Sequence, residues 1–298
     1  MRTRRTSARI ASATVGVEAR QTVAVSISEG SLNVQSVAHR DDPRVADYLD
    51  LNDTVARKRR EGDEFFVAEG PTSVERLMAS NHRVRSVLVA ANKLDRLAPV
   101  LASLGAPVYV ASRDVLAAVV GFELNRGVVA AADRRPLWEL ADLAATSTRL
   151  AVLERLSDPE NLGAIARSAR AFGFDGLVLD PTCIDPYYRR TVRVSMGEVL
   201  HLRVARATEW PADLDVLHDA GFETWAMSPA PDGETLWDLE ARTRTAVVLG
   251  AEGPGLSRAV LDGSSRRVRI PISAGVDSLN VGAAAAVTFA AVTRTRTT

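Results

Sequence analysis

The feature that most constrains the fold is a repeated alternation of short, β-branched apolar runs with helical stretches. Such alternation predicts an α/β fold, in which helices cover the faces of a largely parallel sheet. It occurs in two series. The first has apolar runs at 65–68, 84–89, 108–110 and 128–131, and the second at 150–153, 176–179, 202–205, 222–227, 246–249 and 268–272. Because 298 residues exceed the size at which one core keeps growing, two series predict two domains.

The segments outside the two series set the domain boundaries. Residues 134–148 begin with Arg134-Arg135-Pro136 and end in a polar stretch, which predicts a linker with room for one short helix. The domains are therefore expected at 43–133 and 149–298. Residues 1–42 are rich in Arg, Ser and Thr, with no acid before Glu18, and predict a disordered arm. A solvated tail or a wrongly chosen start codon is favoured over a transit peptide.

Charge and cysteine content exclude few functions but indicate the cellular compartment. Lysine plus arginine and aspartate plus glutamate both total 37, so attraction to a polyanion has to come from local patches. The single cysteine, Cys183, excludes an internal disulfide and a cysteine-based metal cage, which indicates a reducing compartment. The longest weakly polar stretch, Leu279–Val292, is too short to span a bilayer. We expect a cytoplasmic protein that binds neither metal nor membrane.

Three loops follow apolar runs of the second series, at the sheet edge where α/β proteins bind ligands. The first, 156–163, leads into a helix that carries Arg167. Asp158-Pro159 ends the strand, and the free N–H groups of the new helix suit an anion or a polar substrate group. The alternative is a simple helix cap by Asn161 with a solvated Arg167, and on this loop alone that alternative is favoured.

The second loop, 249–257, holds three glycines, which permit close approach of the backbone to a ligand. It lacks the Lys-Ser/Thr ending of a phosphate loop, so a nucleoside triphosphate is disfavoured. Glu252 has no second carboxylate beside it, which favours a hydrogen-bonding or ribose-facing acid over a metal ligand. The third loop, 270–282, carries Ser278 and Asn280 before a helix of small residues. Those small residues indicate a helix that packs unusually close to a neighbour.

Together the three strings resemble the signature motifs of the SpoU/TrmH family within the SPOUT superfamily. The matching strings are Asn161-x-Gly163-x-x-x-Arg167, then Gly250-x-Glu252-Gly253-x-Gly255-Leu256, then Ile270-Pro271 through Ser278-Leu279-Asn280-Val281, with Val194-Ser195-Met196-Gly197 between the first two. The resemblance covers about 150–292, and Gly282 departs from it because relatives often have serine there. Upstream, Phe66-Val67-Ala68-Glu69-Gly70 and Arg126-Gly127-Val128-Val129 are similar to a ribosomal-protein-like (L30e-like) RNA-binding domain.

The resemblance implies a C-terminal trefoil-knotted SPOUT methyltransferase domain, preceded by a small α/β L30e-like domain. It implies methyl transfer from S-adenosylmethionine to a ribose 2′-hydroxyl of structured RNA, ribosomal or transfer, by a homodimer paired through the knotted domain. The residues implied to hold the cofactor are Leu249, Gly250, Glu252, Gly253, Ile270, Ile272, Leu279 and Asn280. Those implied to be catalytic are Asn161, Arg167, Ser278 and Asn280, the arginine acting near the partner's cofactor. Arg167 is not expected to act as the base, because an arginine side chain stays protonated in proteins.

Basic residues outside the motifs are candidates for contacts with RNA phosphates: Arg57, Arg59, Arg60, Arg126, Arg189, Arg190 and Arg193. For the run 57–60 the alternative is a solvated helix end, and for the later cluster it is a set of surface salt bridges. Two other functions stay open. One is a non-catalytic RNA-binding or assembly protein that keeps the fold, and the other is a knotted enzyme that methylates a base, although relatives of that chemistry carry different strings.

Overall fold

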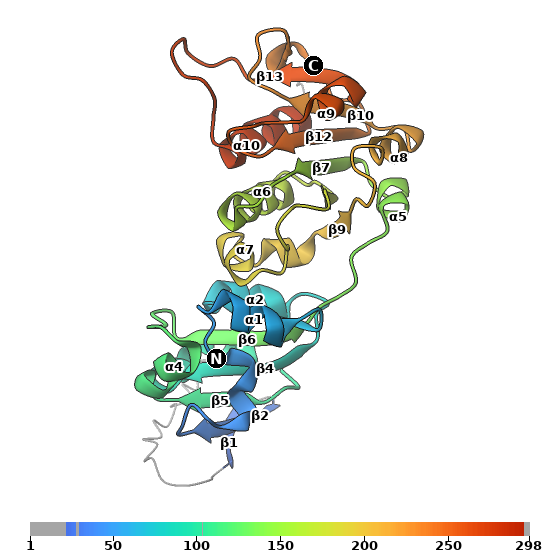
Figure 1. The fold of residues 1–298 in the computed structure, drawn as a ribbon. Coiled ribbons are helices and arrows are strands. Elements are labelled where there is room, and N and C mark those ends of the chain that lie inside the picture. The colour runs from blue at the N-terminus through green and yellow to red at the C-terminus, as the bar shows by residue number, and fades with distance from the viewer. Residues whose placement is uncertain (1–21, 28–29, 103, 295–298) are drawn as a thin grey trace, which may run out of the picture.

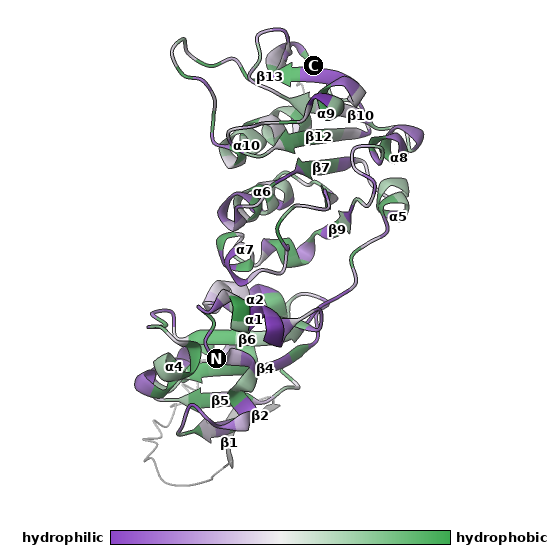
Figure 2. Cartoon of the chain, viewed as in Figure 1, coloured by the Kyte–Doolittle hydropathy of each residue, from purple (hydrophilic) through white to green (hydrophobic). Residues whose placement is uncertain are grey.

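The structure is a computed structural model that describes residues 22–27, 30–102 and 104–294. It contains two α/β units, each built on its own sheet, placed end to end along the long axis of the molecule (Figure 1). Most strands of both units are apolar, whereas β13 is largely hydrophilic, and hydrophilic residues also gather on helices such as α1 (Figure 2). No helix in the described part of the chain is both long enough and apolar enough to cross a membrane.

The first unit is a six-stranded mixed sheet with the strand order β1-β2-β5-β4-β6-β3. Its strands are β1 (Thr22–Ile27), β2 (Gly30–Val37), β3 (Phe65–Glu69), β4 (Val84–Ala90), β5 (Val108–Ala111) and β6 (Val128–Asp133). Its helices are η1 (Pro43–Tyr48), α1 (Thr54–Glu61), α2 (Pro71–Met78), η2 (Ala91–Lys93), α3 (Leu94–Leu101) and α4 (Arg113–Val120). The four strands expected from residue 65 onward are confirmed.

The prediction of a disordered arm over 1–42 is wrong for its second half. β1 and β2 pair with each other, and β2 lies parallel to β5, with Val34 opposite Val108. Leu32, Val34 and Val37 of β2 are buried, so this strand completes the apolar core of the first sheet. The alternation of Leu32 and Val34 with polar residues is the strand signal that the average composition of the segment concealed. Residues 1–21, also part of the predicted arm, lie outside the described residues.

The second unit is a seven-stranded parallel sheet with the order β11-β13-β10-β12-β7-β8-β9. Its strands are β7 (Arg149–Glu154), β8 (Gly176–Leu179), β9 (Arg203–Arg206), β10 (Glu223–Met227), β11 (Glu234–Thr235), β12 (Thr245–Gly250) and β13 (Arg266–Arg269). Its helices are α5 (Leu140–Ala145), α6 (Pro159–Ala171), α7 (Arg189–Val194), η3 (Glu198–His201), α8 (Leu214–Asp219), η4 (Leu236–Asp238), α9 (Arg258–Gly263) and α10 (Val281–Thr293). The expected α/β class with a parallel sheet is confirmed.

The last strand differs from the expected run at 268–272, because it ends at Arg269. Pro271 has no N–H to donate to a neighbouring strand and restricts the backbone of the residue before it. The chain therefore leaves the sheet before Pro271 and runs as an irregular loop to Asn280. This early exit frees the third loop to pass the ends of the neighbouring strands.

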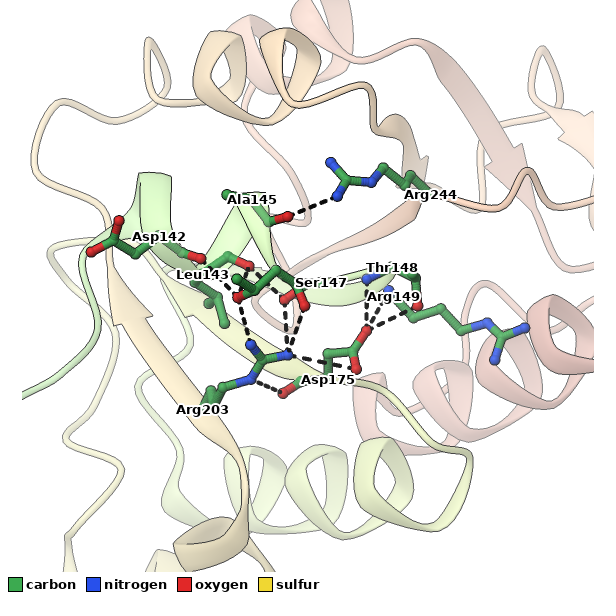
Figure 3. A network of polar contacts seen from close by, with 10 residues as sticks. Asp142, Leu143, Ala145, Ser147, Thr148, Arg149, Asp175, Arg203 and Arg244 are labelled. Atoms are coloured by element: carbon green, nitrogen blue, oxygen red, sulfur yellow. Dashed lines mark hydrogen bonds and ion pairs between the residues drawn. The ribbon is translucent and has the colours of Figure 1, made fainter.

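The predicted linker, 134–148, is shorter than expected. Helix α5 lies within it, and its buried Leu143 and Ala144 pack into the apolar core of the second sheet. A polar network fixes the end of α5 to the strands: Arg203 donates to Ser147 Oγ over 3.2 Å, and Asp175 Oδ2 accepts from the backbone N–H of Thr148 over 2.7 Å (Figure 3). Residues from Trp138 onward therefore belong to the second unit, since Trp138 N also donates to Val204 O.

The two units are in close contact. The buried carboxylate of Glu69, at the end of β3, accepts from Arg189 and Arg193 of α7. Beside it, the turn after α7 approaches α2 so closely that a Cβ on Gly197 would lie 2.9 Å from Cβ of Arg76. Only glycine fits this contact. The L30e-like identity of the first unit and the knot in the second stay predictions.

Candidate functional site

A cavity of about 520 Å³ lies at the carboxyl edge of the second sheet. Its walls come from four places: the end of β10, the end of β12 with the glycine loop that follows, the irregular loop 270–280, and the first residues of α10. The volume falls within the range of small-molecule sites, about 300–1,000 Å³. The position is also the one where parallel α/β sheets bind ligands.

The cavity collects the residues that the second and third loops were expected to contribute. It is lined by Leu249, Gly250, Glu252, Gly253, Ile270, Ile272, Ser278, Leu279 and Asn280, which include all eight expected cofactor residues. Their role as cofactor ligands stays a prediction. The sequence missed Met227, Ser228 and Pro229, which form another wall. A sequence signal for these residues was present, because Met227 ends β10 and the other two follow it, and β10 lies between β12 and β13 in the sheet.

The glycine loop turns back on itself directly after β12. Gly255 N donates to Ala251 O over 3.0 Å, which closes the turn. A Cβ on Gly250 would lie 2.4 Å from the carbonyl carbon of Gly255, so no side chain fits at this position. Gly253 and Gly255 have φ values of +84° and +65°, which residues with a Cβ adopt only with strain. The turn therefore depends on glycine for two different reasons.

The far side of this loop is anchored to the end of β7. Glu154 is 3% exposed, and its carboxylate accepts from both N and Oγ of Ser257 over 2.7 Å and from Trp210 Nε1 over 3.0 Å. The next residue, Arg155, has φ +56° and donates from Nη2 to Gly255 O over 2.9 Å. These contacts hold this wall of the cavity in place. The sequence did not single out Glu154 or Arg155, although two charged residues ending a buried strand were visible.

Two asparagines and a glutamate join the three loops. Asn280 Nδ2 donates to Asn161 Oδ1 over 2.9 Å and to Oε1 of Glu252. Asn280 Oδ1 accepts from Ala283 N over 3.1 Å and so caps α10. An amide side chain is needed because the same residue donates to two acceptors and also accepts from the backbone. The first, second and third loops thus meet at Asn280.

Helix α10 packs closely against α6, as its small residues predicted. A Cβ on Gly282 would lie 3.1 Å from Cβ of Ala164, which is tighter than ordinary side-chain contacts. Near the other end of α10, the ring of Phe289 lies 4.1 Å between centroids from the ring of Phe174, in the turn after α6. The departure from serine at Gly282 therefore has a packing reason, because a larger residue would push the two helices apart.

Arg167 lies apart from the cavity. It is exposed on α6, does not line the cavity, and forms no hydrogen bond or ion pair with any residue that the structure describes. Its guanidinium is thus available to a group outside this chain. Of the four residues expected to be catalytic, Asn161 and Asn280 are in contact, Ser278 lines the cavity, and Arg167 is separate.

Several arginines expected to contact RNA are held inside the protein. Arg57 is buried in an ion pair with Glu61 at 2.6 Å and lies over the ring of Tyr188, and Arg189 is paired with buried Glu69. The prediction of phosphate contacts is wrong for these two side chains, since they close the contact between the units. Arg60 donates to Leu49 O, Arg190 pairs with exposed Glu160, and Arg193 pairs with Glu69. Arg59 and Arg126 are exposed and have no partner among the described residues.

The chemistry available at the cavity is restricted. No histidine or cysteine lines it, and no group of three or more metal-ligating side chains occurs in the described ranges 22–27, 30–102 and 104–294. Burial raises the pKa of the Cys183 thiol to about 12, so this cysteine is not a thiolate nucleophile at neutral pH. The site can bind and orient a ligand through backbone groups, amides and one carboxylate.

Comparison with known proteins places these features in context. Residues 148–290 match the SpoU rRNA Methylase family. A Mycobacterium tuberculosis protein named an uncharacterized tRNA/rRNA methyltransferase is 45% identical over 267 residues, which cover 88% of this chain and 93% of that protein. An AdoMet-bound rRNA methyltransferase from Sinorhizobium meliloti has the same fold, with a TM-score of 0.72 and 24% identity over 87% of this chain and 97% of that one. A structure named RNA 2′-O ribose methyltransferase gives a TM-score of 0.70 at 26% identity, covering 86% and 97%.

Proposed function

The chain belongs to the SpoU family of RNA methyltransferases, and we propose that it transfers a methyl group from S-adenosylmethionine to a ribose 2′-hydroxyl of structured RNA. The relative named RNA 2′-O ribose methyltransferase, 26% identical over most of both chains, supports ribose as the acceptor. The observation that carries the proposal is the single cavity in which the second and third signature loops meet, with the first joined to them through Asn161.

The cavity fits the proposed cofactor. Its apolar walls, Leu249, Ile270, Ile272 and Leu279, suit an adenine ring, and the backbone of the glycine loop offers N–H and C=O groups to the ribose and the amino acid end. Glu252 is the acidic group available to a ribose hydroxyl or an ammonium. When bound, S-adenosylmethionine supplies an electrophilic methyl group on a sulfonium centre.

The acceptor hydroxyl has to be oriented and its developing negative charge stabilised. Arg167 is suited to this task because its guanidinium is always charged and is engaged by no other described group. It cannot take the proton, which we assign to an RNA phosphate. Asn161, Ser278 and Asn280 fix the geometry around the acceptor. Because Arg167 does not line the cavity of its own chain, we propose that it acts at the cavity of a second copy in a homodimer.

The variant Arg167→Ala tests the catalytic role. We expect methyl transfer, measured with a tritiated donor, to be lost, while calorimetry finds unchanged affinity for S-adenosylmethionine. Arg170→Ala is the matched control, since Arg170 is exposed on the same helix one turn later and should retain activity. Nucleoside analysis of the product should detect 2′-O-methylated nucleosides. A methylated base, or no methylated nucleoside from any RNA, would contradict the proposed reaction.

Mixed dimers test the role of the second copy. Arg167→Ala keeps an intact cavity, and Gly250→Ala keeps an intact arginine. If Arg167 acts across the dimer, mixing the two inactive variants restores one complete site per heterodimer and hence part of the activity. If it acts within its own chain, every site in the mixture lacks one component, and the mixture stays inactive.

A further inference from the structure

A second cleft, also of about 520 Å³, lies between the two units. It is lined by Lys58 of α1, Asp63, the linker residues 134–137, the segment Asp185–Tyr187 after β8, and Arg206 at the end of β9. None of these residues lines the cavity at β10 and β12. The cleft is therefore a distinct site, formed only because the two units are in contact.

The cleft has an excess of positive charge. Four cations line it, Lys58, Arg134, Arg135 and Arg206, against two acids, Asp63 and Asp185. Arg134 is paired with Asp185 at 2.5 Å, so that pair is internally neutralised. Lys58 and Arg135 are exposed and have no hydrogen-bond or ion-pair partner in the described part of the chain for their charged groups. The excess therefore rests on groups that are free to bind an anion.

Arg206 is held in a fixed orientation at one side of the cleft. Its Nη1 donates to Asp180 O over 2.8 Å and to Cys183 O over 3.0 Å. Both acceptors are carbonyl groups, so they orient the guanidinium without neutralising its charge. The Nε and Nη2 groups, which form the other edge of the planar fork, have no partner among the described residues. A preoriented edge with two parallel N–H groups matches the geometry of a phosphate.

The cleft and the cavity lie on the same edge of the second sheet. Arg206 is the last residue of β9 and Gly250 the last residue of β12, and all strands of the sheet are parallel. The strand order β12-β7-β8-β9 places these two ends three strand spacings apart, about 14 Å at roughly 4.8 Å per spacing. A polyanionic chain bound in the cleft can therefore reach the cavity along a single edge.

We propose that this cleft binds the phosphate backbone of the RNA whose ribose is methylated, with Arg206 as the oriented phosphate ligand and Lys58 and Arg135 as flanking charges. This inference rests on the proposed function. The inference adds to the proposed function that the RNA binds in the cleft between the units. Arg57, Arg189 and Arg193 are instead engaged in holding the units together.

The test measures RNA binding separately from catalysis. The probes are unmodified transcripts of ribosomal and transfer RNA, and the dissociation constant is measured from 50 to 300 mM salt. We expect Lys58→Ala/Arg135→Ala to weaken binding at least tenfold near 150 mM salt. The slope of log affinity against log salt should fall by about 1.4–1.8, because each lost phosphate contact removes about 0.7–0.9. Affinity for S-adenosylmethionine should be unchanged.

Arg96→Ala/Arg258→Ala is the matched control, because both side chains are exposed and line neither the cleft nor the cavity. Arg206→Lys keeps the positive charge but loses the oriented guanidinium. It should weaken RNA binding with little change in the slope of log affinity against log salt. Equal slopes and affinities for the cleft and control variants would overturn the proposal. Wild-type protein that binds RNA through these residues yet methylates no ribose would instead refute the proposed reaction and leave the cleft assignment standing.

Discussion

The substitution Gly250→Ala should open the glycine turn and remove cofactor binding. The new Cβ would lie 2.4 Å from the carbonyl carbon of Gly255, where ordinary contact begins at 3.4 Å, so the turn has to move by about 1 Å. The loop cannot swing as a unit, because Glu154 holds Ser257 and Arg155 holds Gly255. Overpacking of this kind costs about 1–3 kcal/mol. Loss of the hydrogen bond between Gly255 and Ala251 adds about 1 kcal/mol.

A penalty of about 2–4 kcal/mol on the binding-competent loop raises the dissociation constant of S-adenosylmethionine by about 30-fold to several hundredfold. Calorimetry on the purified protein measures this change. Gly263→Ala in α9 is the control, since its Cβ meets Leu214 at an ordinary 3.5 Å and its φ is not positive, so stability and affinity should stay close to wild type. Wild-type affinity in Gly250→Ala would refute the argument that the turn is closed against its neighbour.

Three further changes probe other parts of the structure. Burial alone would raise the pKa of Asp175, but hydrogen bonds from the N–H groups of Thr148 and Arg149 hold that pKa below its ordinary value of 3.8. The ionised carboxylate therefore stabilises the fold fully above about pH 4, and this stabilisation is lost as the pH falls through the pKa of the folded state. Asp175→Asn should lower the melting temperature at pH 7 and flatten the decline of the melting temperature between pH 5 and 3. Glu69→Gln leaves Arg189 buried without an anion, which costs about 3–5 kcal/mol and should split or lower the calorimetric transition, and an unchanged transition would show that the pair does not hold the units together. Asn161→Ala leaves the Asn280 amide with one acceptor fewer and should reduce methyl transfer at least tenfold while the circular dichroism spectrum is retained; full activity would exclude a positioning role for Asn161.

Local patterns predicted most of the strands and the meeting of the loops. Runs of β-branched residues located β7, β8 and β12 within one or two residues, and the carboxyl-edge rule located the cavity-forming loops after β12 and β13. β2 was missed because its alternating Leu32 and Val34 stand in a segment of otherwise polar composition. Chain length and hydrophobic periodicity do not predict that β2 pairs with β5, which comes more than 70 residues later.

The charged residues were less predictable than the strands. The carboxylate that pairs with Arg57 is four residues away, at Glu61, but the one that pairs with Arg189 belongs to Glu69, 120 residues earlier in the chain. A run of basic residues in the sequence shows how much positive charge is present. It does not show which acidic residue, distant in the sequence, will pair with that charge after folding. The cations that no acid neutralises, Lys58, Arg135 and Arg206, are distributed over three separate segments, so no single stretch of sequence marks the cleft they form.

The glycine contact at Gly197 has a consequence for substrate length. Because α2 packs directly against the turn that contains Gly197, the two units are in close contact at this point. An RNA element bound in the cleft between the units, as proposed, would then be presented at a constant distance from the cavity. Adding base pairs between that element and the target nucleotide should abolish modification instead of shifting it to a neighbour.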